Sequence, residues 1–424
     1  MRILIVNTSE DVGGAAQAAH RLMDALNNNG HKAKMLVRKK CSENLTVVGI
    51  DRPLAAKWKF LWERLCIFFR LRFRRKNLFA IDIANTGFDI TQMHEFREAD
   101  VIHLHWINQG MLSLKGIKKI LDTGKPVVWT MHDLWPATAI CHLSLDCKHF
   151  QDKCGNCMLL PGGGADKDLS SKVWKRKKNL YDGANIQFVT CSGWLENQAR
   201  QSSLLSNSFI TSIPNPIDNR IFHDYDKDAA RREFNLPLDK KLILFVAQRV
   251  TNQFKGMDYL IAACKKMVEL HTETQNDVSM LIMGGDSEQI VAQLPFTAYS
   301  LGYVRDSVEI MKIYNASDTF VLPSLSENLP NTIMEAMACG VPCVGFNVGG
   351  IPEMIEHHIT GYVAKYKDSD DLAEGIYNTL YVYDREAMST AALIKVNRSY
   401  SQSAVALQYT EVYNEALLRS KGES

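Results

Sequence analysis

The stretch DTFVLPSLSENLPNTIMEAMACGVPCVGF, residues 318–346, decides the fold of this chain. Residues 318–322 form a short apolar run that is typical of a buried strand, and residues 330–338 carry helix signals. Gly340 ends that helix, Pro342 prevents it from resuming, and residues 343–346 form a second buried run. The order strand, loop, helix, strand predicts half of an open α/β sheet. Such sheets bind ligands at the carboxyl ends of their strands.

Two carboxylates mark the loop and the helix of this stretch. If the helix begins near Pro330, Glu335 lies about 7.5 Å along its axis, and Glu327 precedes it in the loop. The pair can bracket one elongated ligand, and the helix N-terminus between them favours an anion such as phosphate. The alternative is a solvated glutamate on a loop and another on an exposed helix face.

The same alternation extends outward through two halves of the chain. Strands are expected at residues 2–7, 33–37, 101–106, 126–131, 186–190 and 209–213, and again at 242–247 and 279–283. Asn215–Asp218 has turn chemistry and is a plausible linker, and residues from about 370 to 418 are mostly helical. The pattern predicts an α/β chain with two doubly wound parallel sheets and a ligand cleft between the domains.

Composition limits the class of protein. A chain of 424 residues is too long for one ordinary core, and 46% hydrophobic with 23% charged residues is ordinary for a globular protein. The net charge of +2 gives no reason to expect a nucleic-acid partner. With no secretory leader pattern, no apolar run of membrane-spanning length and ten cysteines, we expect a reducing, cytoplasmic location.

Three further groups of candidate residues follow predicted strands. Gly13 and Gly14 end a loop and begin a helix, either to let a ligand approach the backbone or simply to form a tight turn. His132 ends a strand and is either a structural histidine or one that hydrogen-bonds a sugar or polarises a reacting group. Arg249 and Lys255, six residues apart, either clamp a diphosphate or belong to a solvated basic loop.

In combination these residues resemble the retaining GT-B glycosyltransferases of family 4, the group 1 glycosyl transferases. Glu327 and Glu335 match the E-x7-E pattern of that family, and the flanks PSLSE, MEAMACGVPCV and GGIPE match its extended motif. The segments QRV…FKG, NPID with Phe222, and TMHD at residues 130–133 are similar to its other motifs. The resemblance covers residues 1–395. It implies two Rossmann-like domains facing a cleft: residues 1–215 on the acceptor side, residues 216–395 for the nucleotide-sugar, and a helix in residues 396–424 that crosses back.

The resemblance also implies roles for the matched positions. Arg249 and Lys255 would hold the donor diphosphate, and Glu335 the ribose. The donor sugar would lie against Glu327 and the backbone N–H groups of Asn328 and Leu329. His132 would lie beside the transferred sugar, while Gly13 and Gly14 would close on the donor from the other domain. The family often has Gly-Phe-Gly where this chain has Asn328-Leu329-Pro330, so the identity of the donor sugar stays open.

The implied activity is retaining transfer of a sugar from a UDP- or GDP-sugar to a glycan or lipid-linked acceptor. The expected product is a cell-surface polysaccharide or glycolipid. Fixed cations and helix N–H groups would stabilise the departing diphosphate, so no catalytic metal is expected. Two alternatives remain. One is another GT-B enzyme, an epimerase or a phosphorylase, and the other is a non-catalytic subunit that binds sugar nucleotides.

Four cysteines, Cys141, Cys147, Cys154 and Cys157, form C-x5-C-x6-C-x2-C within 17 residues. This spacing predicts a structural zinc site that fixes a loop near the acceptor side, with His142 and His149 as substitute ligands. The segment also resembles cysteine-rich insertions in some family 4 transferases of polysaccharide gene clusters. Free or redox-active thiols and disulfides are the alternatives.

A basic aromatic segment spans residues 55–80 and contains KWKFLWERLCIFFRLRFRRK at residues 57–76. It has eight cations and one acid, interleaved with tryptophan and phenylalanine. An amphipathic helix of this kind suits the surface of an anionic membrane, which predicts peripheral attachment to the inner face. In the alternative, its aromatic side chains pack on the first sheet.

Overall fold

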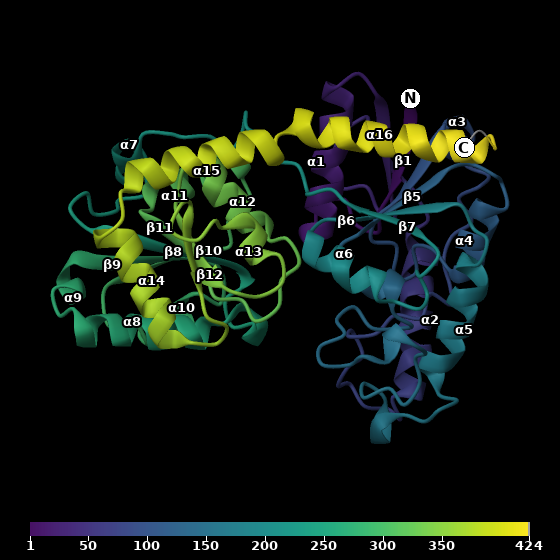
Figure 1. Cartoon of the computed structure of the whole chain (residues 1–424), viewed down its shortest axis with the longest axis horizontal. Helices are drawn as coiled ribbons and strands as arrows, with labels where there is room; N and C mark the ends of the chain where they lie inside the picture. The colour runs from purple at the N-terminus through teal and green to yellow at the C-terminus, as the bar shows by residue number, and fades with distance from the viewer. Residues whose placement is uncertain (423–424) are drawn as a thin grey trace. The chain divides into compact units, whose positions relative to one another are not determined.

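The computed structural model describes residues 1–422 and contains two open sheets whose strands all run parallel (Figure 1). The strand orders are β3-β2-β1-β4-β5-β6-β7 and β10-β9-β8-β11-β12-β13. The predicted α/β fold with two Rossmann-like, doubly wound sheets is therefore confirmed. In both sheets the order reverses between two central strands, at β1 and β4 in the first sheet and at β8 and β11 in the second.

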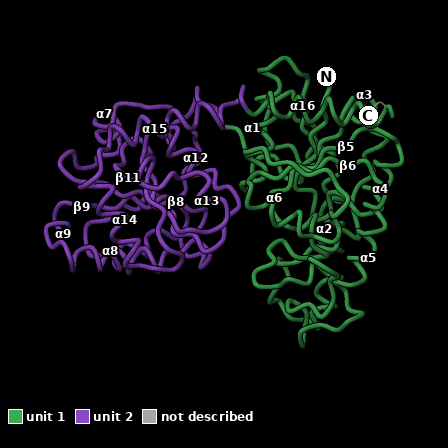
Figure 2. The backbone as a smooth tube through the Cα atoms, viewed as in Figure 1, with its two compact units in different colours: residues 1–216, 405–424 green, residues 217–404 purple. Residues whose placement is uncertain are grey.

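The chain divides into two compact units (Figure 2). The first unit joins residues 1–216 to the chain from Val405 onward, and the second contains residues 217–404. The last helix of the chain therefore packs with the first unit, although it follows the second in sequence.

The first unit is built of seven strands and seven α-helices within the described residues. The strands are β1 (Arg2–Val6), β2 (Lys32–Val37), β3 (Val47–Gly49), β4 (Val101–Leu104), β5 (Val127–Met131), β6 (Ile186–Thr190) and β7 (Phe209–Ser212). The helices are α1 (Gly14–Asn28), α2 (Pro53–Arg70), α3 (His94–Glu98), α4 (Leu114–Leu121), α5 (Leu169–Tyr181), α6 (Gly193–Arg200) and α16 (Gln402–Ser420).

Successive residues of the central strands serve two different cores, because strand side chains alternate between the faces of a sheet. Ile3 and Ile5 of β1 pack with helices α1 and α16 on one face. Leu4 and Val6 of the same strand belong to the core on the opposite face, which includes residues of α4 and α6. Burial on both faces explains why these strands are almost continuously apolar.

The second unit contains six strands and nine α-helices within the described residues. The strands are β8 (Lys241–Arg249), β9 (Val278–Gly285), β10 (Ala298–Gly302), β11 (Thr319–Leu322), β12 (Cys343–Phe346) and β13 (Gly361–Ala364). The helices are α7 (Lys227–Glu233), α8 (Met257–Leu270), α9 (Thr274–Asp277), α10 (Glu288–Val291), α11 (Ser307–Ala316), α12 (Asn331–Ala338), α13 (Ile351–Met354), α14 (Ser369–Tyr381) and α15 (Arg385–Ser399).

Three strands, β3, β10 and β13, were not predicted, and each lies at the edge of its sheet. Edge strands have a neighbour on one side only and are often short. β10 has no fully buried residue, and β3 has three residues of which one is buried. These two short, half-exposed strands leave no apolar run in the sequence, so the pattern that reveals central strands is missing there, whereas β13 is mostly buried but has only four residues.

Candidate active site

In the second unit, Arg249, Lys255 and Glu327 follow the two strands at which the sheet order reverses. Arg249 is the last residue of β8, Lys255 ends the short 3-10 helix Gln253–Lys255 after it, and Glu327 lies in the loop after β11. The Lys255 ammonium donates a hydrogen bond to the Glu327 carboxylate. The structure thus joins two side chains that lie 72 positions apart in the sequence.

Two glycines fix the loops that carry this ion pair. Gly256 has φ of 72°, and a Cβ added there would lie 1.8 Å from the carbonyl oxygen of Pro323. Gly349 has φ of 59°, and a Cβ there would lie 1.6 Å from the carbonyl oxygen of Glu327. No other residue type fits such close backbone approaches, so both glycines are required to hold the loop after β11 in place.

Glu335 lies on α12, one position past the middle of the helix, and accepts a hydrogen bond of 3.1 Å from the Tyr314 hydroxyl. Burial and the neighbouring carboxylate raise the pKa of Tyr314 well above its usual range, so its hydroxyl stays protonated and able to donate. Tyr314 is fully buried on α11, and its hydrogen bond orients the Glu335 carboxylate. Tyr314 could not be singled out from the sequence, because a buried tyrosine in an apolar helix has no distinguishing pattern.

In the first unit, His132 follows β5 and contacts His105, which follows β4. Their rings stack, and His132 Nε2 lies 2.9 Å from His105 Nδ1. Burial lowers the pKa of His132 to about 4, with Asp133 opposing the shift, and burial also lowers the pKa of His105. Both imidazoles are therefore neutral near pH 7, and one donates the hydrogen bond that the other accepts.

A third histidine, His103, connects β4 to the last helix of the chain. Its Nδ1 lies 2.8 Å from the Tyr413 hydroxyl of α16, and its Nε2 lies 2.8 Å from the Thr130 hydroxyl. The Thr130 hydroxyl in turn lies 2.8 Å from that of Tyr409. The alternation His103-x-His105, within the strand predicted at residues 101–106, is a visible signal for this column of histidines that was not used in predicting the site.

Gly13 and Gly14 lie where β1 gives way to α1. Gly13 has φ of 91° and precedes the first residue of the helix, Gly14. A Cβ at Gly13 would meet nothing within 4 Å, so the positive φ is what favours glycine there.

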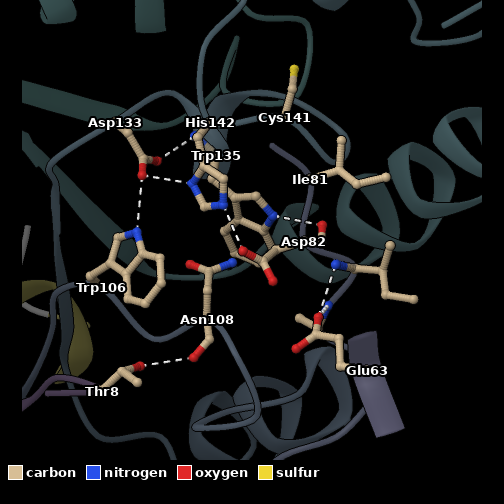
Figure 3. A network of polar contacts seen from close by, with 12 residues as sticks. Thr8, Glu63, Ile81, Asp82, Trp106, Asn108, Asp133, Trp135, Cys141 and His142 are labelled. Atoms are coloured by element: carbon tan, nitrogen blue, oxygen red, sulfur yellow. Dashed lines mark hydrogen bonds and ion pairs between the residues drawn. The ribbon is translucent and has the colours of Figure 1, made fainter. Parts of the chain in front are cut away.

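A charged network connects the residue after His132 to the cysteine segment (Figure 3). The His142 ring lies between two carboxylates, with Nδ1 2.7 Å from Asp133 Oδ2 and Nε2 2.6 Å from Asp82 Oδ2. Burial opposes a charge on this ring, but Asp133 and Asp82 outweigh it and raise the pKa of His142 to about 10. Trp106 stacks on the ring and donates a hydrogen bond of 3.0 Å to Asp133. His142 is thus a largely buried cation that fixes Asp133.

The cysteine segment does not support the zinc prediction. Cys141, Cys147, Cys154 and Cys157 are free thiols that line one small pocket together with His149. Nevertheless, residues 1–422 contain no group of three or more His, Cys, Asp or Glu side chains placed to hold a metal ion. Burial raises the pKa of Cys141 to about 12 and that of Cys154 to about 11, so these thiols are protonated near pH 7. The disulfide alternative is also not observed for these four residues.

Helix α2 exposes an apolar stripe that follows the helical period. The stripe consists of Leu54, Trp58, Leu61, Trp62, Leu65 and Phe69, all of which are exposed. Trp58 is 71% exposed and Trp62 53%, so the alternative in which the aromatic residues of the segment pack on the first sheet is wrong for these two. The buried side of α2 is formed by Ala56, Glu63, Arg64 and Ile67. Of the helices within residues 1–422, none has the length and apolar character needed to cross a bilayer.

Two doubly wound parallel sheets, each with polar residues at the point where its strand order reverses, together with the solved structures that share them, give this chain the two-domain GT-B fold. Family profiles agree: one described as Glycosyltransferase Family 4 matches residues 12–220, and one described as Glycosyl transferases group 1 matches residues 240–381. The chain therefore carries these two domains in succession and is a glycosyltransferase.

Curated relatives agree with this assignment, and solved structures share the fold. An uncharacterised glycosyltransferase of Methanocaldococcus jannaschii is 27% identical over 81% of this chain and 91% of its own length. A D-inositol 3-phosphate glycosyltransferase of Thermobispora bispora is 29% identical over 77% of this chain and 73% of its own. Sucrose-phosphate synthase from Thermosynechococcus elongatus superimposes with a TM-score of 0.66 at 17% identity, covering 99% of both chains. HepE of Anabaena in complex with UDP-glucose gives 0.62 at 15% identity, covering 98% of this chain and all of that one.

Proposed function

We propose that this chain is a retaining glycosyltransferase that uses a UDP- or GDP-sugar. Its acceptor is a glycan or lipid-linked glycan at the cytoplasmic face of a membrane, and its product a cell-surface polysaccharide or glycolipid. The observation that carries the proposal is the contact between Lys255 and Glu327 in the loops that follow β8 and β11, the two strands at which the sheet order reverses. A cation and an acid held together at this point suit a ligand with both a phosphate and a sugar hydroxyl.

The ion pair suggests how the donor binds. Lys255 is paired with Glu327 in the structure, and its side chain is still 31% exposed. A donor diphosphate attracts the ammonium more strongly than one carboxylate does, because it carries more charge. Lys255 and Arg249 then hold the diphosphate, while Glu327 and the N–H groups of Asn328 and Leu329 face the sugar. Glu335, oriented by Tyr314, accepts from the ribose hydroxyls.

Transfer breaks the bond between the anomeric carbon and the diphosphate oxygen, and the bonding electrons leave with the diphosphate. The acceptor hydroxyl attacks from the same face and gives its proton to the departing phosphate oxygen, which retains the configuration. The fixed cations of the second unit stabilise the developing charge. In this proposal His132, as a neutral imidazole, hydrogen-bonds the transferred sugar, and Gly13 and Gly14 close on the donor.

The decisive test is Lys255→Ala, assayed for donor consumption in the presence of cell-derived glycolipid. We expect transfer to fall below detection while the far-UV circular dichroism spectrum and melting temperature stay unchanged. Lys265→Ala, an exposed lysine on α8, is the matched control and keeps full activity. Transfer by Lys255→Ala at a rate near that of the wild type contradicts the diphosphate assignment.

Screening by thermal shift with UDP- and GDP-sugars identifies the nucleotide. A donor present at 100 times its dissociation constant stabilises the protein by about 2.7 kcal/mol. Stabilisation without donor turnover points instead to a sugar-nucleotide-binding subunit. Absorbance of a lysine-bound pyridoxal group points to a phosphorylase.

We further propose that α2 attaches the protein to an anionic membrane. The stripe defined above presents tryptophan and leucine side chains to solvent, and Arg70, Arg72, Arg74, Arg75 and Lys76 follow it closely in the chain and are exposed. Apolar residues beside a dense group of cations match a bilayer whose surface is negatively charged. Attachment there would bring the first unit to a lipid-linked acceptor.

A further inference from the structure

A basic pocket of about 500 Å³ opens in the first unit where β2 and β3 end and α2 begins. Five cations line it, against a single acid, Asp51; the cations are Arg38, Lys39, Lys40, Arg52 and Lys57. The volume is within the range of small-molecule sites, roughly 300–1,000 Å³. The balance of charge selects an anionic ligand and disfavours a neutral sugar.

The first turn of α2 adds to the positive field of this pocket. Arg52 precedes the helix, Pro53 is its first residue, and Pro53, Ala56 and Lys57 all line the pocket. No side chain caps the first N–H groups of this 18-residue helix. The positive end of the helix dipole and the five cations therefore favour the same kind of ligand, a phosphate group.

Hydrogen bonds connect the pocket to the acceptor side of the active site. The backbone N–H of Arg38 donates to the Thr8 carbonyl at 3.2 Å, in the loop after β1. The Arg38 guanidinium donates to the Gln109 carbonyl at 2.7 Å, in the loop after β4. These two loops flank the point where the order of the first sheet reverses. In the same β4 loop, a Cβ at Gly110 would lie 2.9 Å from the Phe60 nitrogen, so that loop also packs closely on α2.

We propose that the basic pocket binds the diphosphate of a lipid-linked acceptor, so that the acceptor is recognised by its phosphates as well as by its sugar. This inference rests on the proposed transfer to a lipid-linked acceptor. The first turn of α2 lines the pocket, and the same helix carries the exposed apolar stripe. A phosphate at the pocket would therefore sit at headgroup level when the stripe enters a bilayer, with its lipid chain in the membrane.

Vesicle binding without any donor tests the pocket separately from catalysis. The probes are phosphatidylcholine vesicles, the same vesicles with phosphatidylglycerol, and the same vesicles with a small fraction of a polyprenyl diphosphate. The pocket variant is Lys40→Gln with Arg52→Gln, and the control is Lys172→Gln with Lys175→Gln, which removes two exposed cations of α5. Melting temperatures verify that both variants fold.

We expect the wild type and the control to bind the polyprenyl-diphosphate vesicles about tenfold more tightly than plain ones, and the pocket variant to lose that gain. Phosphatidylglycerol vesicles should bind the pocket variant and the control alike, and inorganic pyrophosphate should displace the wild type from the diphosphate vesicles. The proposal is wrong if the pocket variant and the control lose binding to the diphosphate vesicles equally, or if binding to phosphatidylglycerol vesicles depends on the pocket in the same way. In either case, general charge attraction explains the binding. Binding of pyrophosphate without any gain from the lipid diphosphate also overturns it.

The two proposals fail in different measurements. A negative vesicle result leaves the dependence of donor turnover on Lys255 untouched. Loss of the Lys255 assignment, in turn, does not change vesicle binding, because no donor is present in that experiment.

Discussion

At the scale of single residues, the position of the loop that carries Glu327 depends on Gly349, whose backbone packs directly against it. Gly349→Ala places a methyl group 1.6 Å from the Glu327 carbonyl oxygen, so the loop must move. We expect affinity for the nucleotide-sugar donor to fall at least about tenfold and stability to fall by about 1–3 kcal/mol. Calorimetric titration with UDP- and GDP-sugars and chemical unfolding measure the two effects.

Gly302→Ala separates backbone strain from the clash. Gly302 has φ of 65°, close to the 59° of Gly349, but a Cβ there meets nothing within 4 Å. This control should therefore share part of the loss of stability and keep full affinity for the donor. Equal loss of affinity in both variants would show that the effect does not come from the loop of Glu327.

A second residue prediction concerns Glu63, which is fully buried on α2. One of its oxygens accepts hydrogen bonds from the N–H groups of Ile83 and Ala84, and the other has no hydrogen-bond partner. Burial and the nearby Asp82 raise the pKa of Glu63 to about 7 from an ordinary value of 4.5. The folded protein therefore holds this proton at a pH where the unfolded chain has lost it, so stability falls as the pH rises from 4.5 through 7.

Glu63→Gln keeps the acceptor oxygen and removes the titration. We expect this variant to match the wild type near pH 5 and to exceed its free energy of unfolding by about 1–3 kcal/mol near pH 8. Urea unfolding at the two pH values measures the difference, and Glu43→Gln, an exposed acid, is the control. A variant with no advantage at pH 8 would show that Glu63 ionises without cost in the folded protein.

At this scale, the sequence predicted which residues would bind an anionic ligand. It predicted Lys255 and Glu327 as candidates, but their direct contact depends on two loops 72 positions apart. It did not predict Tyr314, His105 or Asp82. Tyr314 and Asp82 contribute through burial and through partners distant in the sequence, which a single sequence does not record, whereas His105 could have been noticed from the His103-x-His105 alternation.

At the scale of secondary-structure elements, α2 buries one face, which includes the charged pair Glu63 and Arg64, and exposes its apolar stripe to solvent. We expect Trp58→Ala with Trp62→Ala to lower binding to phosphatidylglycerol-containing vesicles at least about tenfold, because each tryptophan contributes buried area in the bilayer. Tyr303→Ala, an aromatic residue of the second unit that is 57% exposed, is the control and should bind as the wild type does.

Salt separates the two contributions to that binding. High salt screens the cations near α2, so it should weaken binding of the wild type and leave a remainder that depends on the tryptophans. If the stripe instead covers a second copy of this chain, the wild type sediments as a dimer without lipid and the tryptophan variant as a monomer. That result would contradict the membrane assignment.

Strands could be predicted from the sequence to the extent that they are buried. The predicted strand at residues 343–346 matches β12, and the predicted strand at residues 318–322 matches β11 to within one residue, because both are buried on two faces. The zinc prediction for the cysteine segment at residues 141–157 lacks support in the structure for a different reason. Spacing along the chain indicates which thiols can meet, but here they line one pocket without reaching a metal-holding arrangement.

At the scale of the whole molecule, the chain ends by returning to the unit in which it began. Val405, Tyr409, Val412, Tyr413 and Ala416 of α16 are buried against β1, β2 and α1. The core of the first unit is therefore incomplete until the last helix has been synthesised and has packed against it. Disruption of α16 should destabilise strands near residue 1 more than the second unit, which immediately precedes the helix in sequence.

Tyr413→Ala tests this arrangement. Tyr413 is fully buried, and replacing a large buried aromatic side chain by alanine costs about 3–5 kcal/mol. We expect hydrogen exchange, followed by mass spectrometry, to accelerate in β1, β4 and β5 and to remain unchanged in β8 and β11. Tyr413→Phe keeps the ring and removes only the hydroxyl that meets His103, so it should cost about 1 kcal/mol. If Tyr413→Ala accelerates exchange equally in both sheets, the stability of the second unit also depends on α16, and the two cores do not unfold as separate units.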